Sequence, residues 1–147
     1  MVNKDTVFED TFNVIWDLIN GNVPDPESRT NTQWIFASFP DTTKRTFGGY
    51  PIIIVSNPRL SLVRGMNFSK NMYGNTILVN LDIYDTKSSR IDTIGSLIYK
   101  AFRDNISTLK SQKLHNMRMN ASTTSTGVIN GKKIHNRTFV VIFDYAE

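Results

Sequence analysis

The residues best suited to chemistry lie where a predicted strand meets a predicted helix, with Asp82 and Asp85 just before Lys87. Two carboxylates and a lysine at a strand end can hold Mg²⁺ and position water for phosphodiester hydrolysis. In a regular strand, however, Asp82 and Asp85 point to opposite faces, and no third acid precedes them on another predicted strand. Turn chemistry before a helix explains Asp85, Thr86 and Ser89 fully. A metal-dependent nuclease is therefore kept only as an alternative.

Other catalytic arrangements have less support. His115 and His135 lie in a basic segment without a neighbouring carboxylate, which favours surface positions over metal binding or proton transfer. No G-x-S-x-G pattern supports a serine nucleophile, and Gly48-Gly49 lacks the surroundings of a phosphate-binding loop. The chain has no cysteine, which excludes disulfides and thiol catalysis. We therefore predict no enzyme activity, no cofactor and no metal site.

An amphipathic helix is predicted near the N-terminus. The pattern Thr6-x-x-Glu9 is that of a capping box, and Asn20-Gly21 is expected to end the helix because glycine adopts the left-handed conformation easily. Its apolar face repeats at helical spacing and comprises Phe8, Phe12, Ile15 and Ile19.

A strand running directly into a second helix is the best-defined part of the sequence. Segment 77–85 alternates, with one apolar face and one half-polar face, as in an antiparallel sheet with one side open to water or to a neighbour. Ser89-x-x-Asp92 is a second capping-box pattern. The helix predicted over 89–106 carries its apolar face at helical spacing, on Ile91, Ile94, Ile98 and Phe102.

Further strands are predicted on both sides of this unit. They are 33–39, the buried central strand 52–55, a meander over 59–73, and the last strand 137–145. Asn130-Gly131 predicts a type I′ hairpin turn, within a polar β-arm over 122–136 that reaches beyond the domain. The fold class is therefore α+β, in one domain over 1–147. Two amphipathic helices are expected to pack on one face of a mainly antiparallel or mixed sheet with a long C-terminal hairpin.

Charge is distributed unevenly although the net charge is only +4. Residues 1–30 sum to −4, residues 42–81 to +5 and residues 105–143 to +6. This asymmetry allows charge-complementary self-assembly. It also leaves open a small nucleic-acid-binding module, with Lys44 and Arg45 interleaved with Phe47 and Tyr50. No apolar segment predicts a signal peptide or a membrane span, so we expect a chain kept in the cytoplasm.

The order of elements resembles the tail terminator and tail-completion (head–tail joining) proteins of long-tailed bacteriophages. The resemblance rests on Tyr50-Pro51 leading into the apolar segment 52–55, and on the V-x-L-D-I-Y segment 79–84 running into a helix. It implies a non-enzymatic virion protein, assembled in the host cytoplasm as a ring that is commonly a hexamer. It also implies that the ring caps the tail tube, contacts the tube protein and the head-completion or connector protein, and passes DNA through its lumen without sequence-specific binding.

The residues expected to make contacts between subunits or with these partners are charged or lie on the half-polar sheet face. They are Asp10, Asp17, Lys44, Arg45, Arg59, Arg64, Asn80, Tyr84, Arg118, Lys132, Lys133 and Arg137.

Overall fold

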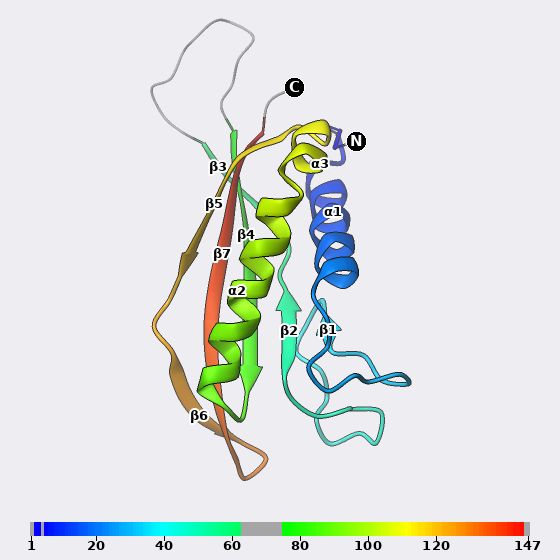
Figure 1. The fold of residues 1–147 in the computed structure, drawn as a ribbon, viewed down its shortest axis with the longest axis vertical. Coiled ribbons are helices and arrows are strands. Elements are labelled where there is room, and N and C mark those ends of the chain that lie inside the picture. Colours follow the sequence, from blue (N-terminus) through cyan, green and yellow to red (C-terminus); the bar gives the residue numbers. More distant parts are fainter. Residues whose placement is uncertain (1, 4, 63–74, 146–147) are drawn as a thin grey trace, which may run out of the picture.

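A computed structural model describes residues 2–3, 5–62 and 75–145, and within them the predicted α+β fold is confirmed. Figure 1 shows the helices on one face of a single sheet, which is mostly antiparallel. The helices are α1 (Val7–Asn22), α2 (Ser88–Asp104) and α3 (Ile106–Ser111). The strands are β1 (Ile35–Phe36), β2 (Ile52–Val55), β3 (Arg59–Leu62), β4 (Asn75–Asp85), β5 (Leu114–Ala121), β6 (Ser125–Ile129) and β7 (Lys132–Tyr145).

The two longest strands, β4 and β7, form the centre of the sheet. Their antiparallel register runs from Asn75 opposite Tyr145 to Asp85 opposite His135. On the far side of β4, β2 pairs with its second half and β3 with its first half. On the far side of β7, β5 and β6 follow one another along the same edge. Among the described strands, only the short β1 is parallel to its neighbour, β2, so the sheet is mixed.

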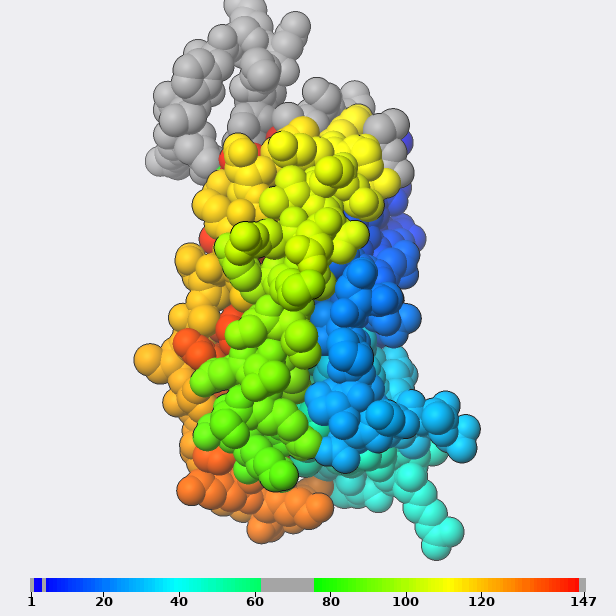
Figure 2. Space-filling view, viewed as in Figure 1, coloured from blue at the N-terminus to red at the C-terminus, as the bar shows by residue number. Residues whose placement is uncertain are grey.

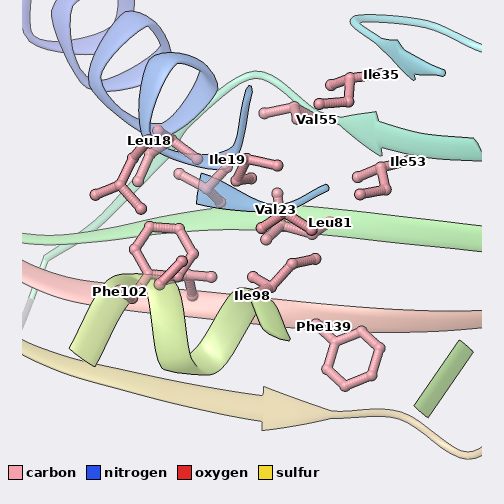
Figure 3. Close-up of a cluster of buried hydrophobic side chains, with 14 of the residues drawn as sticks. Leu18, Ile19, Val23, Ile35, Ile53, Val55, Leu81, Ile98, Phe102 and Phe139 are labelled. Atoms are coloured by element: carbon pink, nitrogen blue, oxygen red, sulfur yellow. The ribbon is translucent and has the colours of Figure 1, made fainter. Parts of the chain in front are cut away.

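The hydrophobic core lies between this sheet and helices α1 and α2 (Figure 3). Alternate residues of β4 point into it, and Ile77, Val79, Leu81 and Ile83 are at most 1% exposed. The helix face predicted from periodicity is confirmed, because Ile91, Ile94, Ile98 and Phe102 are likewise buried. The apolar faces of β4 and α2 therefore pack in one core, as the period-two pattern of the strand and the period-3.6 pattern of the helix predict.

Helix α1 begins and ends differently from the prediction. No side chain among the described residues caps its first turn; the Thr6 hydroxyl instead donates to Asp10 Oδ2 at 2.6 Å. Gly21 does not end the helix, which continues to Asn22 and stops at an extended Val23. The residue before a proline is forced out of helical geometry, so Pro24 sets the end. Phe8, placed on the core face by the prediction, is 47% exposed.

Helix α2 also lacks the predicted capping box. It starts one residue earlier, at Ser88, without a side-chain cap. The Asp92 carboxylate, expected to cap this turn, instead accepts from Arg137 Nη1 at 2.6 Å. The helix stops at Asp104 rather than near 106, and the chain re-forms as the short α3.

The C-terminal hairpin is confirmed, with positive φ at Asn130 and Gly131 as a type I′ turn requires. The free arm predicted over 122–136 is wrong in extent, since β7 pairs with β4 as far as His135. The strand predicted over 33–39 shortens to β1. Of the meander predicted over 59–73, only β3 falls within the described residues.

Candidate functional site

A cluster of exposed cations forms at the end of the molecule that carries the β6–β7 turn. The Asn130 side-chain amide donates to the Thr42 hydroxyl, so the turn lies against the loop between β1 and β2. Both segments carry two of the predicted contact residues, and all four are exposed. We call this cluster the basic end and define it as Lys44, Arg45, Lys132 and Lys133. The structure thus brings together four residues that are far apart in sequence.

A polar groove lies between α1 and the segment from the end of α2 through α3, and it contains both predicted acids. Its volume is about 460 Å³. Its lining residues are Asp10, Asn13, Val14, Asp17, Leu18, Asn22, Asn105, Thr108 and Gln112. We call it the acidic groove. The described residues that line it include two acids and no cation.

Asp10 is held in place at the start of this groove. Its carboxylate accepts from the Thr6 hydroxyl at 2.6 Å and from the Asn3 backbone N–H at 2.9 Å. The Thr6 bond first, and then the Asn3 bond, lower the pKa of Asp10 below its ordinary value. Because hydrogen bonds to the charged form stabilise it, this carboxylate remains negative throughout the physiological range.

The acidic groove and the basic end lie at different ends of the molecule. Figure 1 places α3 and the start of α1 at one end and the β6–β7 turn at the other. In the space-filling view, α1 and α2 lie side by side over the sheet between these ends (Figure 2). Asp10 and Asp17 are therefore separated in space from the four cations of the basic end.

Other predicted contact residues are already bonded within the chain. Arg118 forms an ion pair with Asp144 at 3.0 Å, which lowers the pKa of Asp144. Arg137 donates to Asp92 and to the Ser122 carbonyl, and its guanidinium lies 5.3 Å from the Phe139 ring centre. These two arginines fasten the sheet edge and α2.

Asn80 and Tyr84 lie on the sheet face opposite the helices, as predicted. Tyr84 packs edge to face against Phe39, with ring centres 5.0 Å apart, and burial raises its pKa. Asn80 Oδ1 is buried without a hydrogen-bond partner among the described residues. Arg59 is exposed on β3, and Arg64 lies outside the described residues.

The acids considered for metal-dependent chemistry are separated by the sheet. Asp85 is 0% exposed on the helix side, where Arg90 Nη2 donates to it at 2.7 Å and the Thr86 N–H also donates at 2.7 Å. Asp82 faces the other side and accepts from the Thr138 hydroxyl. Within the described ranges, no group of three acids or histidines is placed to hold a metal ion.

Two arginines that the sequence analysis missed fix the loops beside β2. Arg29 donates to both Asp25 oxygens, to the Gly49 carbonyl at 2.6 Å and to the Pro51 carbonyl at 2.7 Å. Arg90 joins Asp85 to Glu27. We call Arg29 and Arg90 the arginine clamp. The Asp25-x-x-x-Arg29 spacing is a signal of the first ion pair in the sequence, although prolines 24 and 26 also mark this segment as a chain break.

Among the residues described, no helix is both long and apolar enough to cross a bilayer. No model of a protein family matches the chain, and no curated sequence matches it either.

Proposed function

We propose that this protein is a structural subunit that assembles head to tail with copies of itself into a closed ring. In the role implied by the resemblance to phage tail terminators, the ring caps the tail tube at the head–tail junction of a virion. It contacts the tube protein on one side and the head-completion or connector protein on the other. DNA passes through the lumen without sequence-specific binding.

The observation that carries this proposal is the pairing of an acidic groove with a basic end on one chain. A contact between unlike patches leaves a free patch of each kind, so it continues from copy to copy until the assembly closes. A contact between like patches would bring Lys132 and Lys133 against the same residues of another copy, which costs electrostatic energy. The charge distribution therefore favours head-to-tail contact.

Charge-swap complementation tests the contact directly. Lys132→Glu/Lys133→Glu reverses part of the basic end, and Asp17→Lys reverses one wall of the groove. Each variant alone should sediment as a smaller species than the unmodified chain, because like charges then face each other. Mixing the two should restore the larger species, since reversed end and reversed groove are complementary. Lys100→Glu is the control for charge reversal elsewhere, because Lys100 is 71% exposed on α2, where it pairs with Asp104, and belongs to neither surface.

Negative-stain imaging with and without tail tube protein extends the test to the complete proposal. Closed rings of uniform size are expected. They should dissociate as added salt shortens the screening length, which is about 8 Å at physiological ionic strength. A monomer at all concentrations, which forms no ring with tube protein and shows no recovery on mixing the swapped variants, would refute the proposal.

A nucleic-acid-binding module is the second candidate, favoured by the same basic end. Clustered lysine and arginine bind phosphates, and log K then falls linearly with log salt. The proposed aromatic partners are already engaged with each other, since Phe47 and Tyr50 pack edge to face at 5.3 Å. Stacking on bases is thus less available than phosphate contact. Failure to retard DNA or RNA at low salt would remove this candidate.

A further inference from the structure

Strand β6 lies at the edge of the sheet beside β7 and carries none of the usual protecting features of an edge strand. It pairs with β7 on one side, and Figure 1 shows it at the border of the sheet. Residues 125–128 are exposed, and Val128, at 74%, is the most exposed large hydrophobic side chain described. Its sequence, Ser-Thr-Gly-Val-Ile, contains no charge and no proline. Charged residues and prolines are the usual means by which proteins prevent an edge strand from pairing with other chains.

Two other edge strands, β1 and β5, are shielded in recognisable ways. Strand β1 has only two residues, and the Gln33 side chain donates to the Ile35 carbonyl at 2.6 Å. The register of β5 shifts between His115 and Arg118, and a bulge of this kind interrupts the row of groups that another strand would need. β6 has no equivalent device.

The hairpin turn determines which backbone groups of β6 face outward. A two-residue loop makes the flanking residues, Ile129 and Lys132, a hydrogen-bonded pair. Hydrogen-bonded and non-bonded pairs alternate along an antiparallel ladder. Thr126 and Val128 are therefore in non-bonded pairs, and their N–H and C=O groups point away from β7.

We propose that β6 pairs with β6 of a second copy of this chain, antiparallel and centred on Gly127. In this register, Thr126 of each copy lies opposite Val128 of the other, and their outward N–H and C=O groups bond reciprocally. The same alignment places two β-branched side chains together, which favours strand pairing. Gly127 lies opposite its own counterpart at the two-fold axis, where the absence of side chains permits close approach. This self-complementarity identifies a second copy as the occupant.

This contact differs in kind from the head-to-tail contact proposed above, although both involve the β6–β7 hairpin. It relates two copies by a two-fold axis and depends on backbone groups, whereas the other depends on charge. Lys132 and Lys133 flank the paired strands, so salt should strengthen the β6 contact while it weakens the head-to-tail contact. The small area predicts a weak association that requires high protein concentration.

A cysteine at the two-fold axis gives a direct test. Directly opposed residues in a non-bonded pair have Cα atoms about 4.5 Å apart, which a disulfide can span. Gly127→Cys is sterically permitted, since a Cβ there meets nothing within 4 Å. The chain contains no other cysteine, so any disulfide-linked dimer must form through the introduced thiol. Ser125→Cys is the matched control, because its counterpart lies about 14 Å away in this register.

Under mild oxidation in high salt, Gly127→Cys should form linked dimers at least about tenfold faster than Ser125→Cys, because pairing raises the local thiol concentration. Adding Val128→Pro should reduce the rate to that of the control: it removes an outward N–H and leaves the β6–β7 ladder intact. Circular dichroism confirms that each variant is folded. Equal rates for the two cysteines, or open-ended aggregates instead of dimers, would overturn the proposal.

Discussion

Replacing Gly95 in α2 is predicted to destabilise the protein, because Gly95 lies against Phe139 of β7. A Cβ built on Gly95 would approach Phe139 Cζ to 2.3 Å, Cε1 to 2.7 Å and Cε2 to 3.0 Å. Carbon atoms in contact normally lie about 3.5–4.0 Å apart. Phe139 is 5% exposed, and the Arg137 guanidinium lies near its ring. The ring therefore cannot move aside without disturbing its other neighbours.

Two opposing effects set the result of Gly95→Ala. Alanine in a helix interior is favoured over glycine by about 1 kcal/mol. Adding a methylene-sized group to a packed core costs about 1–3 kcal/mol, and a contact this short places the cost at the upper end. We expect a net loss of about 1–2 kcal/mol in the free energy of unfolding, equivalent to roughly 2–8 °C in Tm for a chain of this size.

Urea denaturation of Gly95→Ala and Gly21→Ala measures the two effects separately. Gly21 lies in α1, and a Cβ there meets nothing within 4 Å, so Gly21→Ala should stabilise the protein by up to about 1 kcal/mol. The pair Gly95→Ala with Phe139→Leu should lose less stability than the sum of its single variants, because a smaller side chain makes room. If Gly95→Ala stabilises as Gly21→Ala does, α2 does not pack on β7 as described.

Three further predictions concern the arginine clamp. Arg29→Lys keeps the charge but cannot bridge Asp25 and two carbonyls, so thermal denaturation should show a loss of about 2 kcal/mol. Arg90→Met leaves the charge of the buried Asp85 unpaired and should lower the free energy of unfolding by about 3–5 kcal/mol. Adding Asp85→Asn should recover part of this loss. If it recovers none, Asp85 is not held as a carboxylate paired with Arg90. Burial raises the pKa of Asp25, but bonds from Arg29 and backbone N–H groups outweigh it, and the folded-state pKa lies below 3.8. Stability from Asp25 is therefore present above pH 4 and lost as pH falls through the folded-state pKa, which acid titration of the unfolding free energy in wild type and Asp25→Asn would reveal.

Periodicity predicted the elements that form the core more successfully than it predicted their ends. Ile77, Val79, Leu81 and Ile83 bury as their alternation indicates, and the α2 face buries as its spacing indicates. Both capping-box predictions were wrong. The Asp92 carboxylate accepts a hydrogen bond from Arg137, which lies more than forty residues away in sequence. Pro24, rather than Gly21, ends α1. Local end signals fail when a distant partner or a neighbouring proline acts more strongly.

The candidate surfaces, too, could be predicted only in part from the sequence. The acids of α1 and the cations of two separate segments were evident from composition, but their grouping into a groove and an opposite end depends on how the loop holding Lys44 meets the β6–β7 turn. The sequence does not distinguish Arg118 and Arg137 from Lys132. In the structure, however, each of these arginines forms an ion pair within the chain.

Residue order is sufficient to specify the strand–helix unit and the Asn130-Gly131 turn, because their interactions are between near neighbours and depend on backbone preference and the spacing of apolar side chains. Which charges remain free, which carboxylate is buried and which sheet edge is left open depend on contacts between segments remote in sequence. Those contacts exist only once the chain has packed.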